Sequence, residues 1–316
     1  MEDGSKADAD ARRLIERSGD SGDEMHSMML IFNPFSGRGL SKSAVGTIVS
    51  QLCGSGYIVT AYFAGKYNPD QLVCKYGKHH ELIICVGGDG TLSSVVSGVL
   101  QSSLSIPVGY IPAGTANDVA TTLALSRDPA VAAKKIINGK PRAIDIGLFS
   151  GRYFIYIAAF GAFTGVAYTT PQNAKRALGH LAYILGGLAD MTAIKARHTI
   201  VEYDGNVVEG DFIFGGVANS TSIAGLVKLD PGYVDLADGL FEVILVRQPL
   251  TMADFLDILA SITLQTYDGD NVQLLHAANV KFTFTDDVPW TIDGENGGLH
   301  KEIEIKNFQK AINIMV

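Results

Sequence analysis

From residue 28 onward, short apolar runs alternate with longer stretches of mixed polarity. Leu82–Val86, for example, is apolar throughout, which is typical of a strand buried on both faces of a parallel sheet. The pattern predicts strands at Met28–Phe32, Tyr57–Phe63, Leu82–Val86 and Ile106–Ile111, and helices at Ser41–Leu52, Asp70–Tyr76 and Leu92–Gln101. Because strands and helices alternate, we expect an α/β domain with a mostly parallel sheet.

The pattern changes after about residue 142, where many strands alternate apolar and polar residues. Such alternation is typical of antiparallel strands with one solvated face. The predicted strands are Ala143–Leu148, Tyr153–Ala159, Thr199–Tyr203, Asn206–Phe214, Phe241–Arg247, Val280–Phe284 and Glu302–Lys306, with helices at about Arg176–Ala193 and Met252–Ile262. Asp204-Gly205-Asn206 is a hairpin signal. The sequence therefore predicts a second domain rich in antiparallel strands.

Composition and charge set limits on this picture. The 316 residues exceed the usual size of one domain, and 47% apolar residues are enough for a sizeable core. Residues 1–27 are polar and without strong apolar periodicity, so we expect a flexible leader there. The net charge is −8 without a clustered basic face, so we expect no nucleic-acid partner.

The cysteines and the apolar stretches bear on location. Cys53, Cys74 and Cys85 are odd in number and lack CxxC spacing, so we expect reduced, mostly buried thiols in a cytosolic protein. The longest apolar stretch, around Tyr153–Phe163, is too short to span a bilayer. The N-terminus lacks the basic-then-apolar order of a signal peptide. We expect a cytoplasmic protein whose contact with a membrane is peripheral.

Three glycine-containing loops each follow an apolar strand. They are Asn33-Pro34-Phe35-Ser36-Gly37-Arg38-Gly39, Gly87-Gly88-Asp89-Gly90-Thr91 and Pro112-Ala113-Gly114-Thr115-Ala116-Asn117-Asp118. Loops at the carboxyl ends of parallel strands converge on one crevice, and glycine lets backbone N–H groups approach phosphate oxygens. Each loop alone is also explained as a turn in which Ser36, Thr91 or Asn117 caps the next helix. Three in succession favour a phosphate-binding site, although none is a P-loop.

Together the three loops resemble the signatures of the diacylglycerol kinase catalytic domain, a superfamily that includes soluble bacterial lipid kinases, sphingosine kinases and ceramide kinase. The resemblance extends over nearly all of residues 28–316. It implies an N-terminal parallel-sheet α/β nucleotide domain of the NAD kinase/phosphofructokinase type and a C-terminal β-sandwich-like domain, with the active site in the cleft between them. We expect the nucleotide domain at residues 28–142, a β-rich lipid-substrate domain at 143–300, and a segment at 301–316 that returns to the first domain.

The resemblance also implies the chemistry, an ATP- and Mg²⁺-dependent transfer of phosphate to the hydroxyl of diacylglycerol or a related lipid. Phosphoryl transfer needs positioned phosphates and a carboxylate to accept the alcohol proton. The predicted nucleotide-binding residues are Asn33, Pro34, Phe35, Ser36, Gly37, Gly87, Gly88, Asp89, Gly90, Thr91, Leu92, Ser93, Thr115 and Asn117. Asp89 is also a catalytic candidate that orients Mg²⁺ or a phosphate network, and its alternative role is to cap the next helix.

Two Asp-Gly stretches supply the remaining candidates. Two carboxylates three residues apart beside a glycine turn suit a hard cation, and they also fit a plain turn. The resemblance assigns Mg²⁺ to Asp235, Asp238 and the backbone carbonyl of Leu240. The second stretch is Thr291-Ile292-Asp293-Gly294-Glu295, and its pattern alone predicts a turn between strands. The resemblance makes Glu295 the proton acceptor, with Asp293 as the second candidate.

Other positions match the family less securely. Lys175, the third catalytic candidate, resembles a basic residue of the family's inter-domain charge network, whereas its residue pattern alone favours a solvated helix lysine. The stretch Ala64-Gly65-Lys66-Tyr67 lacks a threonine that often contacts nucleotide there. Tyr156 stands where an asparagine is common. These departures predict a specialised lipid-facing surface.

Two alternative functions remain open from the sequence. One is an NAD kinase-type phosphotransferase, against which the first loop and the Asp235/Asp238 stretch argue. The other is a catalytically silent lipid- or nucleotide-binding homologue. We expect ATP and a lipid at a membrane surface as partners, and we allow for a homodimer.

Overall fold

The computed structural model of the protein describes residues 26–36, 41–115, 117–161, 195–223, 227–229, 232 and 234–316. Its first domain is built on a parallel sheet of order β4-β3-β1-β2. The strands are β1 (His26–Phe32), β2 (Tyr57–Phe63), β3 (Leu82–Gly87) and β4 (Val108–Pro112), and the helices are α2 (Lys42–Cys53), α3 (Pro69–Tyr76), the 3-10 turn η1 (Gly77–His79), α4 (Asp89–Gln101), α5 (Asp118–Thr122) and α6 (Pro129–Asn138).

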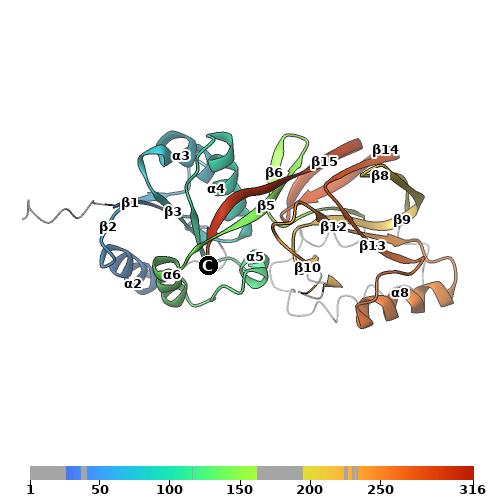
Figure 1. Ribbon diagram of the computed structural model, residues 1–316, viewed down its shortest axis with the longest axis horizontal. Helices are drawn as coiled ribbons and strands as arrows, with labels where there is room; N and C mark the ends of the chain where they lie inside the picture. The colour runs from blue at the N-terminus through green and yellow to red at the C-terminus, as the bar shows by residue number, and fades with distance from the viewer. Residues whose placement is uncertain are drawn as a thin grey trace, which may run out of the picture.

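Helices cover both faces of this sheet (Figure 1). Residues of β1 alternate between two cores because successive side chains of a strand point to opposite faces. Met28 and Leu30 pack in the core that includes residues of α2 and α6, whereas Met29 and Ile31 pack in the core that includes residues of α3 and α4. This two-sided burial explains why the first-domain strands read as nearly continuous apolar runs.

The second domain is an antiparallel arrangement of order β13-β12-β9-β7-β14-β15. The strands are β5 (Pro141–Phe149), β6 (Arg152–Phe154), β7 (Ile157–Gly161), β8 (Arg197–Tyr203), β9 (Asn206–Ala218), β10 (Ser222–Ile223), β11 (Val227–Lys228), β12 (Phe241–Arg247), β13 (Val272–Ala277), β14 (Asn279–Ile292) and β15 (Glu295–Met315), with helix α8 (Met252–Leu264). Trp290 lies at the centre of its core, with ring centroids 5.0–5.2 Å from Phe149, Phe160 and Phe282.

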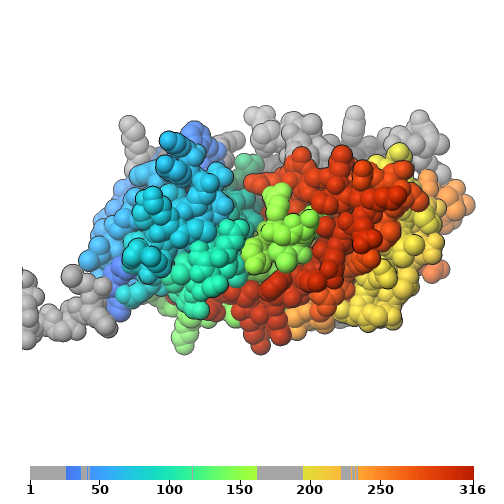
Figure 2. Space-filling model, turned by 90° about the horizontal axis from the view of Figure 1, so that it is seen from above, coloured from blue at the N-terminus to red at the C-terminus, as the bar shows by residue number. Residues whose placement is uncertain are grey.

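The last strand connects the two sheets. β15 pairs with β14 and β5 along most of its length, and Ile314 then pairs in parallel with Val108 of β4. Figure 2 shows its residues (red) packed around the green β5–β6 region, beside the blue first domain. One continuous strand therefore fixes the β-rich domain to the sheet that carries the glycine loops.

Most predicted elements are present, with shifted ends. The hairpin signal is confirmed, since Tyr203 pairs with Asn206 and both loop residues, Asp204 and Gly205, have positive φ. The predicted strand Ile106–Ile111 starts only at Val108, after Pro107, and Glu302–Lys306 is part of the much longer β15. The predicted strand Tyr153–Ala159 is wrong as a single element, because it breaks into β6 and β7 at residues 155–156. The predicted helix Arg176–Ala193 lies outside the described residues.

The prediction of mostly buried cysteines is wrong. Cys85 of β3 is buried, whereas Cys53 and Cys74 are exposed, and all three are free thiols. Both exposed residues lie in helices, Cys53 at the end of α2 and Cys74 in α3, each directly after a buried residue. Apolar character alone did not reveal which face of each helix they occupy.

Candidate active site

The first and second glycine loops are joined by side-chain hydrogen bonds. Asn33 Nδ2 donates to Thr91 Oγ1 at 2.9 Å, and Ser36 Oγ lies 3.1 Å from the same oxygen. The Gly88 N–H donates to Ser36 Oγ at 3.3 Å. Thr91 and Ser36 therefore tie the loops together, which replaces the capping role that was the alternative for each of them. α4 begins at Asp89, earlier than the predicted Leu92, so most of the second loop is the first turn of a helix.

The second and third loops touch through their backbones. The Ala113 N–H donates to Gly87 O at 2.7 Å. A Cβ placed on Gly114 would lie 2.5 Å from Gly88 Cα and 2.8 Å from Asn117 Oδ1, so only glycine fits at this crossing. The three loops at the ends of β1, β3 and β4 thus form one continuous surface, as the sequence predicted.

Asn117 shapes the third loop rather than capping the next helix. It has a left-handed backbone, with φ 55° and ψ 50°, and its side chain makes no capping hydrogen bond to the described residues of α5. Its Oδ1 accepts from the Gly114 N–H at 2.9 Å, and its Nδ2 donates to Gly114 O at 2.9 Å. The alternative reading of Asn117 as a helix cap is therefore wrong.

Asp89 supplies the cap of α5 from a distance. Its Oδ2 accepts from the Asp118 N–H at 2.9 Å, and its Oδ1 accepts from the Val119 N–H at 3.2 Å and the Tyr110 hydroxyl at 3.3 Å. Burial raises the pKa of the Asp89 carboxyl, and these hydrogen bonds partly offset that rise. Burial, followed by the Asp89 charge, raises the pKa of Asp118 to about 6. Asp89 thus holds the third loop against the second.

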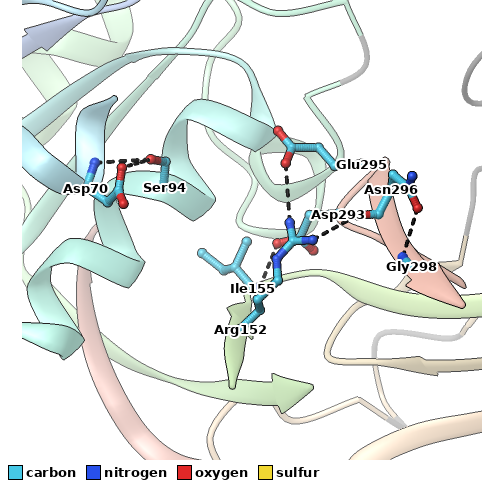
Figure 3. A network of polar contacts seen from close by, with 8 residues as sticks. All are labelled: Asp70, Ser94, Arg152, Ile155, Asp293, Glu295, Asn296 and Gly298. Atoms are coloured by element: carbon cyan, nitrogen blue, oxygen red, sulfur yellow. Dashed lines mark hydrogen bonds and ion pairs between the residues drawn. The ribbon is translucent and has the colours of Figure 1, made fainter. Parts of the chain in front are cut away.

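Glu295 reaches this surface from the second domain. It is the first residue of β15, and a Cβ on Gly90 would lie 3.0 Å from its Oε1. Arg152 of β6 holds the carboxylate, with Nη2 3.4 Å from Glu295 Oε2 and Nη1 donating to Asn296 O at 2.8 Å (Figure 3). Arg152 was not found from the sequence, because its partner lies far away along the chain.

Asp293 is placed differently from Glu295. Its carboxylate is buried and accepts backbone hydrogen bonds from Ile155, Tyr156 and Ile157 at 2.9–3.0 Å. Burial raises its pKa, and the Ser93 hydroxyl and the backbone N–H groups act against that rise. With its oxygens occupied in this way, Asp293 is poorly placed to accept a substrate proton.

The predicted Mg²⁺ residues form a separate group in the loop before β12. Asp235 Oδ1 accepts from the Ala237 N–H at 3.1 Å and Asp238 Oδ1 from the Leu240 N–H at 2.8 Å, so neither bond involves the Oδ2 atoms. Among the described residues, no cluster of three or more His, Cys, Asp or Glu side chains is arranged to hold a metal ion. The predicted Mg²⁺ site is smaller than such a cluster, because Asp235 and Asp238 contribute two carboxylates and Leu240 contributes a backbone carbonyl.

Buried acids surround the Asp238 loop and were missed by the sequence reasoning. Asp145 is fully buried, and it accepts from the Gly239 and Lys310 N–H groups, each at 2.6 Å. Glu242 is 2% exposed, and its Oε2 lacks a hydrogen-bond partner within the described part of the chain. Burial, with added effects from the Asp238 and Asp145 charges, raises the pKa of Glu242 to about 8. Such an excess of carboxylates fits a nearby divalent cation.

The other predicted residues differ in exposure. Pro34, Phe35 and Thr115 are exposed, with Phe35 81% exposed, so all three are open to a ligand. Leu92 is fully buried in the core, so its side chain does not line the loop surface. Gly37 and Lys175 lie outside the described residues, and their roles stay predictions.

The close crossing of Gly88 and Gly114 gives a first test. If the loops bind the phosphates of ATP as the sequence predicts, Gly114→Ala should raise KM for ATP about tenfold or more, because the new methyl group pushes the second and third loops apart. Steady-state kinetics with varied ATP would measure this. Gly46→Ala in α2 is the matched control, since a Cβ there meets nothing within 4 Å and should leave KM unchanged. An unchanged KM in Gly114→Ala would remove this crossing from the nucleotide site.

Together, the glycine-loop surface of an α/β domain and a carboxylate that faces it from a β-rich domain form an arrangement that suits phosphoryl transfer. The profile of the "Diacylglycerol kinase catalytic domain" family matches residues 27–149, and that of the "YegS C-terminal NAD kinase beta sandwich-like domain" matches residues 160–315. The chain belongs to the diacylglycerol kinase catalytic-domain family, and its β-rich half is the β-sandwich-like domain expected from the sequence.

Individual relatives agree with this assignment. The chain is 31% identical to a diacylglycerol kinase of Bacillus subtilis over 92% of this chain and 97% of the relative. It is 34% identical to a diacylglycerol kinase of Staphylococcus aureus over 85% of this chain and 86% of the relative. The crystal structure of a diacylglycerol kinase from Bacillus anthracis has the same fold, with a TM-score of 0.73 at 19% identity over 92% of this chain and 97% of that one.

Proposed function

We propose that this protein is a lipid kinase that transfers the γ-phosphate of ATP to the hydroxyl of diacylglycerol or a related lipid, with Mg²⁺ as cofactor. The observation that carries the proposal is the approach of the Glu295 carboxylate to Gly90 at the start of α4. A carboxylate next to a phosphate-binding loop is where an attacking hydroxyl would lose its proton. The Glu295 side chain is exposed beside Arg152 and is open to an incoming substrate.

Each loop has a distinct part in this proposal. Asn33, Ser36 and Thr91 keep the first two loops in a fixed relation, so that backbone N–H groups and the start of α4 face the nucleotide phosphates. Asp89 and Asn117 fix the third loop beside them. Phosphoryl transfer depends mainly on such positioning, because the reacting groups must align in line.

The residues before β12 suit the cofactor. Asp235, Asp238 and the Leu240 carbonyl would hold Mg²⁺. Two buried acids, Glu242 and Asp145, lie close to the same loop. When bound, the ion would supply positive charge that balances the carboxylates of this loop. Asp145 keeps this loop in place through the Gly239 N–H and connects it to β15 through the Lys310 N–H.

Location follows from the proposed substrate. Diacylglycerol resides in a bilayer, so we propose peripheral contact with a membrane from a cytoplasmic location, and a homodimer stays a prediction. Among the described residues, none of the helices has the length and apolar character needed to cross a membrane.

A substrate panel tests the proposal. Purified protein with ATP and Mg²⁺ should transfer label from γ-³²P-ATP to diacylglycerol in mixed micelles, and EDTA should abolish the transfer until excess Mg²⁺ is added. Phosphorylation of NAD without labelling of any lipid would favour the NAD kinase-type alternative. Binding of lipid and ATP without transfer to any acceptor would favour the silent homologue.

A further inference from the structure

A bulge interrupts β15 where the strand passes from the second domain to the first. The pairing with β5 stops after Phe308 and resumes at Ile312, so residues 309–311 (the β15 bulge) stand opposite Asp145 alone. Lys310, in the middle of the bulge, has a positive φ of 52°. Bulges bend a strand locally and re-aim its side chains, and they are common next to active sites.

Asp145 connects the β15 bulge to the loop before β12. Its N–H donates to Leu236 O at 2.7 Å, and its Oδ2 accepts from the Gly239 N–H at 2.6 Å. Its Oδ1 accepts from the Lys310 N–H of the bulge at 2.6 Å. Because Asp145 is fully buried, these hydrogen bonds are shielded from water and hold the loop and the bulge in a fixed relation.

Gln309 makes a second, direct connection at the surface. Its Nε2 donates to Ala237 O at 3.3 Å. Gly239 has a positive φ of 90°, and a Cβ there would lie 3.2 Å from Gln309 Cδ, so the side chain lies against the turn. Since Gln309 is exposed, this contact can be removed without disturbing the core.

Residues 235–240, here called the cation loop, fall into two interleaved sets. Asp145 and Gln309 hold the residues of one set by their backbone groups, and these are Leu236, Ala237 and Gly239. The residues of the other set carry the proposed Mg²⁺ ligands, and these are Asp235, Asp238 and Leu240. Anchoring the backbone between the ligands fixes their spacing in advance, which lowers the cost of ordering the loop when an ion binds.

We propose that the β15 bulge, through Gln309 and the Lys310 N–H, positions the cation loop for Mg²⁺, and that Mg²⁺ binding stabilises the bulge in return. This inference rests on the proposed Mg²⁺ site. Two coupled sites affect each other by the same factor, so a bulge that favours the binding conformation is itself favoured in the bound state. Beyond the bulge, Ile314 pairs with Val108 of β4, so the coupling reaches the strand that fixes the second domain to the first.

Gln309→Met tests the positioning role with a small change. It removes the donor to Ala237 O and keeps a side chain of similar size against Gly239. Calorimetric titration of Mg²⁺ into the full chain without nucleotide should give a Kd about threefold to tenfold higher, because one hydrogen bond that orders the loop is lost. The thermal stability without Mg²⁺ should change little, since the residue is exposed. An unchanged Kd would overturn the role of Gln309.

Asn313→Leu is the matched control on the same strand. Asn313 pairs with Ala143 beyond the bulge, and the change replaces its exposed carboxamide by an apolar side chain of similar size. Its Kd for Mg²⁺ should equal that of the unchanged protein. An equal rise of Kd in both variants would show that any loss of a polar side chain from this part of β15 has the effect, which would overturn the proposal.

Hydrogen exchange tests the reverse direction, which a purely structural contact would not show. Saturating Mg²⁺ should slow exchange of the Lys310 N–H in the unchanged protein, because this group donates to Asp145 in the same network. The slowing should be smaller in Gln309→Met. If Mg²⁺ left the exchange of Lys310 unchanged, the bulge and the cation loop would be uncoupled and the proposal would be wrong.

Asp238→Ala separates this inference from the proposed Mg²⁺ site. It removes a proposed ligand, so both the Mg²⁺ titration signal and the protection of Lys310 should disappear. Loss of binding in Asp238→Ala with an unchanged Kd in Gln309→Met would refute the role of the bulge and leave the Mg²⁺ site standing. Unchanged binding in Asp238→Ala would refute the proposed site itself, and the bulge would then have no ion to position.

Discussion

Replacing Glu295 by glutamine should lower kcat by about 10²–10⁴-fold while the protein stays folded. The amide keeps the size of the side chain and its contact with Arg152, but it cannot accept a proton from the lipid hydroxyl. Because Glu295 is 61% exposed, the loss of its charge should change the free energy of unfolding little. Transfer of label from γ-³²P-ATP to diacylglycerol measures the first effect, and thermal unfolding measures the second.

Glu304→Gln is the control for a neutralised glutamate on the same strand. Glu304 is exposed and paired with Lys306, also on β15, and no contact connects it to the glycine loops within the described residues. Its activity should equal that of the unchanged protein, since exposed ion pairs contribute little. If Glu295→Gln kept normal kcat, the proton acceptor would have to be another group, and the approach of Glu295 to Gly90 would be incidental.

The sequence predicted the strands of the first domain well because burial on both faces leaves an unmistakable apolar run. It missed α6, although Asp128 caps this helix and Pro129 opens it, a pattern that marks helix starts. The short α5 was expected only as a helix of unstated length after the third loop, capped by Asn117. Its cap is not its own neighbour but Asp89, 29 residues earlier in the chain. Periodicity and local capping signals do not report such a partner.

In the candidate site, too, features with a local sequence signal were predicted and features with distant partners were not. The three loops could be located because each follows a strand end, and parallel strands bring their carboxyl ends together. The break between β6 and β7 could not be located from the sequence. Its N–H groups are satisfied by Asp293, which is 138 residues away from Ile155. Arg152 and Asp145 were likewise invisible, since their partners lie on β15 and in the loop before β12. Long-range polar contacts therefore carry the part of the site that sequence patterns omit.

Replacing Asp89 by alanine should both destabilise the protein and strongly reduce transfer. Its carboxylate accepts hydrogen bonds from the Asp118 and Val119 N–H groups and from the Tyr110 hydroxyl, and the change leaves all three donors without this partner in a largely buried place. We expect the free energy of unfolding to fall by about 2–4 kcal/mol. Freed from the second loop, the start of α5 should shift, and kcat/KM for ATP should fall about 10²-fold or more. Denaturant unfolding and ATP kinetics measure the two effects.

Asp128→Ala separates the two consequences of losing an aspartate cap. The exposed Asp128 is the same kind of cap at the start of α6, and its Oδ1 accepts from the Ala130 and Val131 N–H groups at 2.9 Å and 3.0 Å. Its loss should lower the free energy of unfolding by about 1 kcal/mol and leave transfer unchanged.

If Asp89→Ala lost stability but kept normal kcat/KM for ATP, Asp89 would be a structural cap alone. If it lost activity with unchanged stability, its hydrogen bonds to α5 would contribute little, and a direct role at the phosphates or the metal would account for the effect. The combined loss is expected, because the loop that Asp89 holds is part of the phosphate-binding surface.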